Sequence, residues 1–374
     1  MEKIIVIGGG MVGSTMADDL RATAYDVTIA DNNEKRLNEL RREGISTIIL
    51  DVTNEEMLKI AIQPFDIVLC AVPGFLGFNT VKTIIEAGKN VVDISFFPED
   101  CLVLDKLAVK HNVTAIVDCG VAPGMGNLIL GYHNHRLKYQ SNLEKITDFE
   151  CLVGGLPKER KWPFEYKAPF SPMDVIEEYM RPARYVENSK IITKEPLSDI
   201  EHVEFDKVGT LESFNSDGLR SLMYTMSHIP NMKEKTLRYP GHADKISMLK
   251  KSGFLDKEKI DGISPLEFTS KILFKEWKLK SEKEFTVMRV TIKTNKNKIV
   301  YELYDDGDGE HSSMSRTTGY TATAAINLIL SNRFSKKGVF PPELVGGHDN
   351  CLIYVMDYLS DRGVIYTCTY NLDG

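Results

Sequence analysis

Three consecutive glycines near the start of the chain constrain its fold more than any other feature of the sequence. The apolar run Lys3-Ile4-Ile5-Val6-Ile7 predicts a buried strand, and Gly8-Gly9-Gly10-Met11-Val12-Gly13 follows it directly. Between a strand and a helix, glycines at this spacing allow a tight turn, a close backbone approach to a pyrophosphate and close helix packing. The helix N-terminus also offers unpaired N–H groups to phosphates. Unless it is a glycine-rich turn without a ligand, we expect this loop to bind a dinucleotide through Gly8, Gly10, Met11, Val12 and Gly13.

The first third of the chain continues this pattern, with short apolar runs alternating with stretches of helical periodicity. Six runs predict strands, at residues 3–7, 27–30, 47–50, 67–71, 90–94 and 114–117. Alternation of strand and helix predicts parallel strands with crossover helices, and six strands are the number in a doubly wound nucleotide-binding fold. We therefore expect an α/β protein whose first domain is a Rossmann-type doubly wound parallel sheet.

Acidic and small residues follow the predicted strands at the carboxyl edge, where ligands of doubly wound sheets bind. Asp31 ends the second strand, at about the 20-residue spacing at which an acid accepts hydrogen bonds from the adenosine ribose. Such an acid repels a 2'-phosphate and favours NAD, although Arg36, Arg41 and Arg42 lie near enough to leave NADP open. The alternative for Asp31 is a cap of the following helix. By position alone, the other expected cofactor contacts are Asn32, Asp51, Val52, Ala71, Val72 and Pro73.

After Val117 the pattern of the sequence changes. Apolar and polar residues alternate around residues 149–153 and 288–292, and the polar turn at 295–297 followed by a run at 299–304 predicts a hairpin. Helices are predicted at residues 172–181, 218–226, 243–251 and 320–330. The second half of the chain therefore predicts a second α+β domain with a mixed or antiparallel sheet.

Composition and charge exclude several classes of protein. The net charge is -7 and basic residues are interleaved with acidic ones, whereas a nucleic-acid-binding surface needs a basic cluster. No apolar run reaches the roughly 18 residues of a membrane-spanning helix. The N-terminus lacks the pattern of a secretion signal, so a cytoplasmic location is expected. The six cysteines show neither a C-x-x-C pair nor a spacing with histidine that indicates a metal site.

Five stretches of the chain resemble a known family. They are Asp118-Cys-Gly-Val-Ala-Pro-Gly124, Glu178-Tyr-Met-Arg-Pro-Ala-Arg184, Asp217-Gly-Leu-Arg220, Lys235-Thr-Leu-Arg-Tyr-Pro-Gly-His242 and Ser313-Met-Ser-Arg-Thr-Thr-Gly319. Together they resemble the saccharopine dehydrogenase superfamily and, within it, lysine 6-dehydrogenases most. Saccharopine reductases carry Asp-Pro-Gly where this sequence has Ala122-Pro123-Gly124, and a tyrosine near Phe96-Phe97. Both differences favour the lysine 6-dehydrogenase interpretation.

The resemblance implies how the domains follow one another along the chain. The helix after Gly319 returns to the nucleotide domain, which then comprises residues 1–123 and about 318–374. Residues 124–317 form a domain for substrate binding and dimerisation, so a homodimer is expected.

The resemblance also implies a reaction. In the oxidative deamination of L-lysine at the ε-carbon, NAD accepts a hydride, and water then releases the semialdehyde and ammonia. A saccharopine reductase or another opine-like dehydrogenase is the alternative within enzymes. A protein that senses NAD(H) without catalysis is the alternative from another class, because a fold does not by itself imply a function.

This reaction needs an anchor for the substrate carboxylate. Arg238 is the first choice, because it ends a predicted strand just before a turn. Arg220 and Asp217 could support it, and the resemblance places Phe96 near the substrate. The alternatives are an interface salt bridge for Arg238, and a helix-start acid with a solvated arginine for the other pair.

The reaction also needs a general base. Asp118 follows a strand at the carboxyl edge of the sheet, near the expected nicotinamide, and His242 could approach from the second domain. An aspartate in this position is often a turn former, and a single histidine is often only a hydrogen-bonded partner. The sequence therefore leaves the base open between Asp118 and His242.

Overall fold

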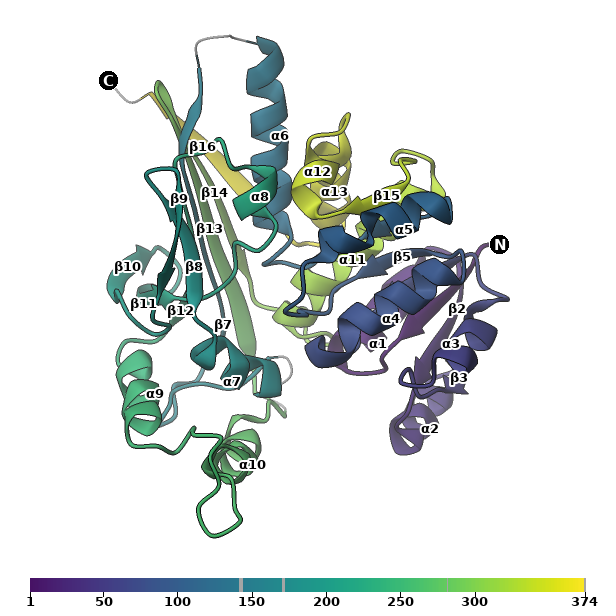
Figure 1. The fold of residues 1–374 in the computed structure, drawn as a ribbon, viewed down its shortest axis with the longest axis horizontal. Helices are drawn as coiled ribbons and strands as arrows, with labels where there is room; N and C mark the ends of the chain where they lie inside the picture. The colour runs from purple at the N-terminus through teal and green to yellow at the C-terminus, as the bar shows by residue number, and fades with distance from the viewer. Residues whose placement is uncertain (141–143, 170–171, 281, 373–374) are drawn as a thin grey trace. The chain divides into compact units, whose positions relative to one another are not determined.

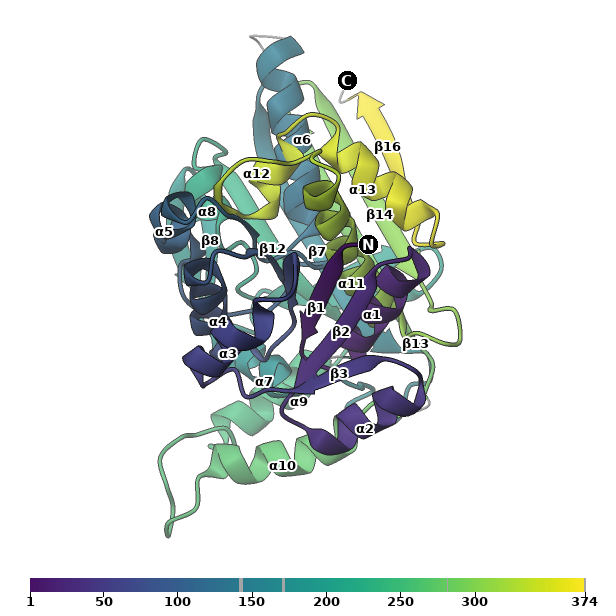
Figure 2. The ribbon, with the colours of Figure 1, turned by 90° about the vertical axis from the view of Figure 1, so that its right-hand side faces the viewer.

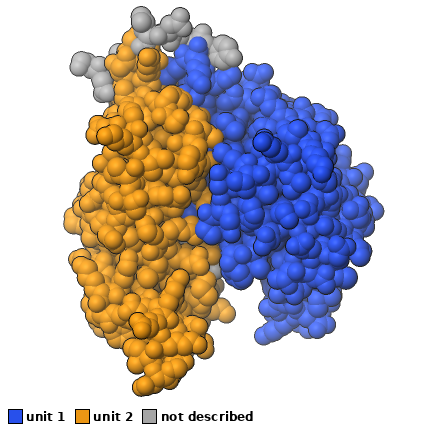
Figure 3. Space-filling model, viewed as in Figure 1, with its two compact units in different colours: residues 1–143, 315–365 blue, residues 144–314, 366–374 orange. Residues whose placement is uncertain are grey.

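The computed structural model describes residues 1–140, 144–169, 172–280 and 282–372. The chain divides into two compact units, which Figure 3 shows in different colours. Unit 1 comprises Met1–Leu143 and Ser315–Ile365, and unit 2 comprises Glu144–Met314 and Tyr366–Gly374. In the described ranges, no helix is both long enough and apolar enough to cross a membrane.

Unit 1 is built on a seven-stranded parallel sheet with the strand order β15-β6-β5-β4-β1-β2-β3. Its strands are β1 (Lys3–Ile7), β2 (Asp26–Asp31), β3 (Ser46–Ile49), β4 (Ile67–Cys70), β5 (Asn90–Asp93), β6 (Thr114–Ile116) and β15 (Gly338–Phe340). Without β15 this is the order of a doubly wound dinucleotide-binding sheet, and its switch point lies between β1 and β4. The predicted Rossmann-type fold of the first domain is confirmed.

Helices cover this sheet on both faces (Figure 1, Figure 2). The helices in this part of the chain are α1 (Met11–Ala22), α2 (Glu34–Arg42), α3 (Glu55–Ile62), α4 (Gly74–Glu86), α5 (Asp105–Lys110), α6 (Met125–Gln140), α11 (Ser313–Leu330), α12 (Pro342–Gly346) and α13 (Cys351–Ser360), with a 3-10 turn at Cys101–Leu104; α6 packs against α12 and not on the sheet. Leu58 of α3 and Ile84 of α4 are fully buried in the same core as Val68 of β4. Burying such a side chain contributes about 1.5 to 3 kcal/mol, which holds these helices on the strands.

Asp19 on α1 joins three parts of unit 1 that lie far apart in the sequence. Its carboxylate accepts hydrogen bonds from the Thr323 hydroxyl at 2.5 Å and from the Tyr358 hydroxyl at 2.7 Å. It also accepts one from Arg362 Nε at 2.5 Å, which forms an ion pair. Thr323 lies on α11 and Tyr358 on α13. A mostly buried ionic cluster therefore fastens the segment after residue 315 to the first helix of the chain.

Unit 2 contains a nine-stranded mixed sheet with the path β10-β11-β12-β7-β13-β14-β16, and β8 pairs with both β12 and β9. Its strands are β7 (Ile146–Pro157), β8 (Ala183–Glu187), β9 (Lys190–Lys194), β10 (Glu201–Phe205), β11 (Gly209–Asn215), β12 (Asn231–Arg238), β13 (Glu284–Thr294), β14 (Asn297–Asp305) and β16 (Tyr366–Leu372). Its helices are α7 (Pro172–Met180), α8 (Leu222–Thr225), α9 (His242–Lys251) and α10 (Pro265–Trp277). β12 runs parallel to β7, whereas β7, β13 and β14 pair antiparallel. The predicted second α+β domain with a mixed sheet is confirmed.

Two segments differ from the domain boundaries that the sequence predicts. Residues 318–374 are predicted in the nucleotide domain, but β16 pairs antiparallel with β14 in the sheet of unit 2. The segment is rich in threonine and tyrosine, which favour strands, and β14 offers it an edge. At the other boundary, unit 1 extends past residue 123 because α6 packs against α12.

Removing the charge of Asp19 should destabilise unit 1. Asp19→Asn keeps the shape of the side chain but deprives Arg362 of its anion, and breaking a largely buried ion pair costs about 3 kcal/mol. We expect a lower midpoint of urea unfolding, followed by circular dichroism. Asp18→Asn is the control, because Asp18 on the same helix faces Arg21 at 3.6 Å in solvent and its loss should cost less than about 1 kcal/mol. Equal stability of the two variants would contradict the role given to Asp19.

Candidate functional site

At two positions of the glycine loop between β1 and α1, only glycine fits. Gly8 has a φ of +108°, and a Cβ there would stand 2.4 Å from the Ala71 carbonyl oxygen. A Cβ at Gly13 would stand 1.9 Å from the Gly8 carbonyl oxygen. At Gly10, in contrast, a Cβ would meet no atom within 4 Å. The loop is therefore closed behind Gly8 and Gly13 and open beside Gly10, where a helix N-terminus can receive a phosphate.

Asp31 holds this loop in place. Its Oδ2 accepts a hydrogen bond from the Gly9 N–H at 2.6 Å, and its Oδ1 accepts one from the Asn33 N–H at 2.8 Å. The cap of α2 is Asn33 and not Asp31, because the Asn33 side chain accepts from the Arg36 N–H. Arg36 Nε donates to the Gly9 carbonyl at 2.8 Å. An acid and a cation thus stand together at the expected ribose position, and a 2'-phosphate or a free ribose hydroxyl would each find a partner there.

The other expected cofactor residues lie where the sequence predicts, at the start of α1 and after β2, β3 and β4. Those with exposed or partly exposed side chains are Met11, Val12, Asn32, Asp51, Val52, Ala71 and Pro73. Val72 is buried and belongs to the core of the unit. Hydrogen bonds from the Thr53 hydroxyl and N–H lower the pKa of the Asp51 carboxyl. Most of this set is available to a ligand, and Val72 contributes packing.

A second polar cluster lies at the carboxyl ends of β4, β5 and β6. Its central residue, Asp93, is not among the site residues that the sequence predicts. Asp93 ends β5 and is fully buried. It accepts a hydrogen bond from the Ser95 hydroxyl at 2.7 Å and another from the Cys70 thiol. Burial and the charge of Asp118 raise the pKa of Asp93 to about 7, against these hydrogen bonds. The one signal in the sequence is an acid that directly follows Val91-Val92 in an apolar strand.

Asp118 and Phe96, both predicted site residues, lie in the same part of unit 1. Asp118 has a φ of +55° in the loop after β6, and its side chain is buried. Phe96 is partly exposed, whereas its neighbour Phe97 is fully buried and packs edge-on against Phe78 of α4. Asp118 therefore combines the position expected of a general base with the positive φ that a turn former adopts.

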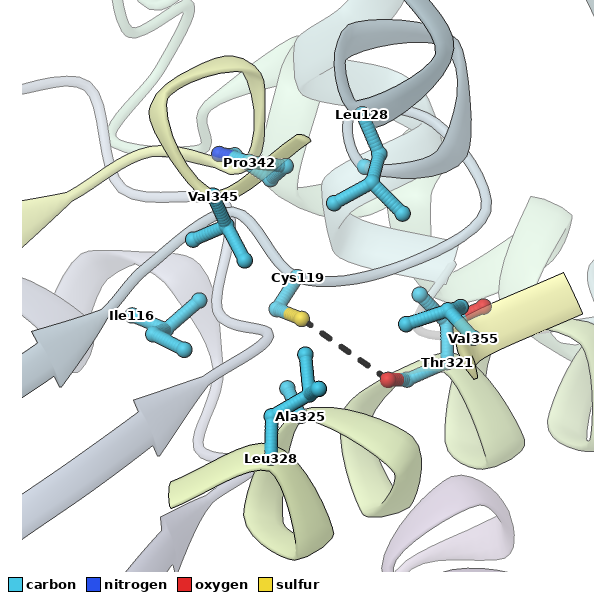
Figure 4. A pocket seen from close by; sticks show the side chains of 10 residues that line it. Ile116, Cys119, Leu128, Thr321, Ala325, Leu328, Pro342, Val345 and Val355 are labelled. Atoms are coloured by element: carbon cyan, nitrogen blue, oxygen red, sulfur yellow. Dashed lines mark hydrogen bonds between the residues drawn. The ribbon is translucent and has the colours of Figure 1, made fainter. Parts of the chain in front are cut away.

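Unit 1 also contains a small apolar cavity (Figure 4). The residues around it are Ile116, Cys119, Gly124, Leu128, Thr321, Ala325, Leu328, Pro342, Val345 and Val355. Figure 4 shows the Cys119 thiol pointing at the Thr321 carbonyl oxygen, 3.9 Å away. None of these ten side chains is charged, so the cavity does not suit a zwitterionic ligand.

In unit 2, Arg238 lies inside a cluster of aromatic residues. Its Nε donates to the Tyr179 hydroxyl at 3.1 Å and its Nη1 to the Leu237 carbonyl at 2.8 Å. Its Nη2 lies 3.6 Å from the Glu178 carboxylate, and the guanidinium stands 4.4 Å above the Tyr166 ring. Arg238 is 3% exposed. A substrate carboxylate would have to displace these contacts, so the arrangement is that of a structural salt bridge, formed here within one unit.

His242 belongs to the same cluster. Its Nδ1 lies 3.0 Å from the Phe164 carbonyl oxygen and donates to it, so the Nε2, 3.0 Å from the Tyr179 hydroxyl, accepts. Burial and the positive charge of Arg238 lower the pKa of His242 to about 3. The imidazole is therefore neutral at pH 7 with both nitrogens engaged, as in the alternative of a hydrogen-bonded partner.

Another group of arginines in unit 2 surrounds Asp217. Arg184 binds this carboxylate with two parallel hydrogen bonds, from Nε at 3.0 Å and from Nη2 at 2.8 Å. Burial and the charge of Arg220 lower the pKa of Arg181, while Asp217 and Glu177 act in the opposite direction. Arg220 itself is 7% exposed. Three guanidiniums thus share the neighbourhood of one buried carboxylate, and two of them, Arg181 and Arg184, are additions to the predicted site.

The predicted substrate and catalytic residues fall into three clusters. In unit 1, Asp118 lies near Asp93, and Phe96 follows Asp93 by three residues in the chain. In unit 2, Asp217 lies with Arg220, and Arg238 lies with His242. In the described part of the chain, no group of three histidine, cysteine or acidic residues could hold a metal ion.

Comparison with known proteins identifies the family. Residues 4–116 match the family model of the saccharopine dehydrogenase NADP binding domain, and residues 120–364 match that of the saccharopine dehydrogenase C-terminal domain. The mitochondrial alpha-aminoadipic semialdehyde synthase of Rattus norvegicus is 23% identical over 275 residues, which are 71% of this chain and 30% of that protein. The saccharopine dehydrogenase (NADP(+), L-glutamate-forming) of Schizosaccharomyces pombe is 25% identical over 280 residues, 71% of this chain and 61% of that protein. The matched region thus spans less than two thirds of either relative.

A solved structure shares the fold over the whole chain. The apo saccharopine dehydrogenase (L-Glu forming) of Saccharomyces cerevisiae superposes with a TM-score of 0.82 at 20% identity, covering 99% of this chain and 100% of that chain. The resemblance to the saccharopine dehydrogenase superfamily is confirmed. The chain belongs to the saccharopine dehydrogenase family, and residues 4–116 form its nicotinamide-cofactor-binding domain.

Proposed function

We propose that the chain is an NAD(P)-dependent dehydrogenase that oxidises a carbon–nitrogen bond of an amino acid. The preferred candidate substrate is L-lysine, oxidised at the ε-carbon that carries its amine. The glycine loop carries this proposal, because it is closed by backbone at Gly8 and Gly13 and open beside Gly10. Membership of the family supports an amino-acid substrate. Ala122, which stands where saccharopine reductases carry an aspartate, supports lysine over saccharopine.

The nicotinamide cofactor would supply the hydride acceptor when it is bound. Oxidation of the ε-carbon transfers one hydride and releases one proton, and water then converts the substrate imine into the semialdehyde and ammonia. The chain itself must hold the substrate carboxylate and accept the proton. We assign the proton to Asp118, because it follows β6 at the carboxyl edge of the sheet, where ligands of this fold bind.

The substrate carboxylate is assigned to Arg220, with Arg184 and Arg181 beside it. The guanidinium of Arg238 already donates hydrogen bonds to the hydroxyls of Tyr179 and Tyr166 and to a backbone carbonyl, and it forms an ion pair with Glu178. Around Asp217, three guanidiniums lie near one buried carboxylate, and Glu177 forms an ion pair with Arg181 at 3.6 Å. A substrate carboxylate could join this group through charge-assisted hydrogen bonds from the guanidiniums.

Saccharopine is the second candidate substrate. It carries more carboxylates than lysine, and the arginine cluster around Asp217 could bind more than one. The relatives named as saccharopine dehydrogenases favour the same substrate. Both candidates require a nicotinamide cofactor and an anchored carboxylate, so the loop and the arginine cluster serve either reaction.

Homodimerisation stays a prediction of the resemblance. β16 is an edge strand of the sheet in unit 2, and Tyr370 on this strand is 60% exposed. Exposed edge strands with large side chains tend to pair with another chain, which supports an interface at this edge.

The substrate class is tested by following NADH absorbance with the pure protein. We expect reduction of the cofactor with L-lysine and little with ornithine, because the shorter chain cannot place its amine at the same distance from an anchored carboxylate. Saccharopine is assayed in parallel, and a faster reaction with it would establish the second candidate. A protein that binds NADH tightly but reduces no cofactor with any amine would instead be a sensor.

Cofactor choice follows from the acid at the ribose position. Titration by nucleotide fluorescence should show tighter binding of NADH than of NADPH, because the Asp31 carboxylate repels a 2'-phosphate. Asp31→Ala should narrow the difference by about tenfold, which corresponds to about 1.4 kcal/mol. Arg36→Ala is the matched variant and should weaken NADPH more than NADH. Equal affinities of the unmodified protein for NADH and NADPH would contradict the role of Asp31 in excluding a 2'-phosphate.

Two lysine substitutions compare the candidate anchors. Lysine keeps the positive charge but loses the planar fork that binds a carboxylate with two hydrogen bonds. Arg220→Lys should lower kcat/KM for the amino acid by roughly 30-fold to 1000-fold, about 2 to 4 kcal/mol, and leave NADH affinity unchanged. Arg238→Lys should lower Tm with normal catalysis per folded molecule. The opposite pattern would return the anchor to Arg238.

A further inference from the structure

The buried carboxyl group of Asp93 has no part in the reaction as proposed above. The Ser95 hydroxyl and N–H donate to its two oxygens at 2.7 Å and 3.1 Å, and the Cys70 thiol donates a third hydrogen bond. The titratable groups that act on it are Cys70 at the end of β4 and Asp118 and Cys119 in the loop after β6. None of these three groups is a cation. An ionised Asp93 is therefore stabilised in this cluster by hydrogen bonds and opposed by a second carboxylate.

Asp93 lies at the carboxyl edge of the parallel sheet. It is in register with Cys70, so the carboxyl ends of β4 and β5 meet at these two side chains. A Cβ at Gly77 of α4 would stand 2.1 Å from the Ser95 hydroxyl, so this helix packs directly on the group that binds Asp93. In doubly wound sheets the two nucleotides lie on opposite sides of the switch point. With the adenosine half assigned to Asp31 after β2, the ends of β4 to β6 would receive the nicotinamide half.

We propose that Asp93 makes the protein distinguish the oxidised from the reduced cofactor, and that it does so by gaining or losing a proton. This inference rests on the proposed function only in that a nicotinamide cofactor binds. The oxidised nicotinamide ring is a cation and the reduced ring is neutral, so an ionised carboxyl group near the ring attracts the oxidised form alone. Because buried charges are weakly screened, Asp93 can act without touching the cofactor.

The proton makes this preference depend on pH. Burial and the charge of Asp118 raise the pKa of Asp93 to about 7, so its charge changes near neutral pH. Binding of a cation favours the ionised form, and by linkage it lowers the pKa of Asp93 and releases a proton. Affinity for the oxidised cofactor should therefore rise with pH. Affinity for the reduced cofactor should not change as Asp93 ionises, because the reduced ring is neutral.

The test is the ratio of the dissociation constants of the reduced and oxidised cofactor, measured on the full chain by calorimetry and fluorescence from about pH 6 to about pH 8. We expect the preference for the oxidised form to increase roughly 5-fold to 10-fold over this range. Asp93→Asn should abolish the increase. Glu99→Gln is the matched control, because it removes an exposed carboxyl group a few residues further along the chain and should leave the increase unchanged.

Two neighbouring variants test the same charge without altering Asp93. Ser95→Ala removes a donor that stabilises the ionised form, so the rise should move to higher pH. Asp118→Asn removes the opposing carboxylate, so the rise should move to lower pH. If Asp93 only supports packing, the two variants should not shift the pH of this rise in opposite directions. These two variants keep the proposal testable if Asp93→Asn does not fold.

The outcomes separate this inference from the proposed function. A ratio that is constant with pH, with both cofactor forms bound, would overturn the inference and leave the proposed function intact. A rise that persists in Asp93→Asn would do the same. If neither form of NAD or NADP binds, the proposed function fails and this inference fails with it.

Discussion

The backbone of the glycine loop presses against its neighbours so closely that no side chain fits, and the cofactor domain depends on this contact. Gly8 meets the Ala71 carbonyl after β4, and Gly13 meets the Gly8 carbonyl from the first turns of α1. Both contacts are to backbone, so no rotation of a side chain could relieve a substitution there. Between these two contacts, a Cβ at Gly10 would meet no atom within 4 Å, so the same loop leaves open space beside this residue. Asp31 completes the arrangement by holding the Gly9 N–H.

Much of the first domain could be predicted from the sequence because its strands are continuous apolar runs between amphipathic helices. Parallel strands buried on both faces leave such runs, and the glycine loop fixes which run comes first. The elements that escape prediction are short or are completed by distant segments. β15 has three residues and pairs with β6, and β16 becomes a strand on the edge that β14 offers. Local propensity does not reveal such pairings, because their stabilisation comes from the partner strand.

For the candidate site as well, the residues that could be predicted are those of one short stretch of sequence. The residues of the glycine loop and Asp31 could be found because their chemistry lies in one short stretch with a fixed spacing. Asp93 could not, because an acid after two valines has the appearance of a strand end. Its character comes from Cys70, Ser95 and Asp118, which the sheet and its loops bring around it. A buried carboxyl group in such company acquires a pKa near 7, whereas the same residue in solvent would be an ordinary surface charge.

Arginine shows why a motif alone does not identify an anchor. Arg238 and Arg220 both lie in stretches typical of the family, and the sequence ranks Arg238 first. What decides is how much of the guanidinium is already engaged. A buried guanidinium must be paired, and Arg238 meets this requirement within its own unit through Tyr179, Glu178 and a backbone carbonyl. Around Asp217 the same requirement is met by several groups together, because Arg184 binds Asp217 with two hydrogen bonds and Arg181 forms an ion pair with Glu177.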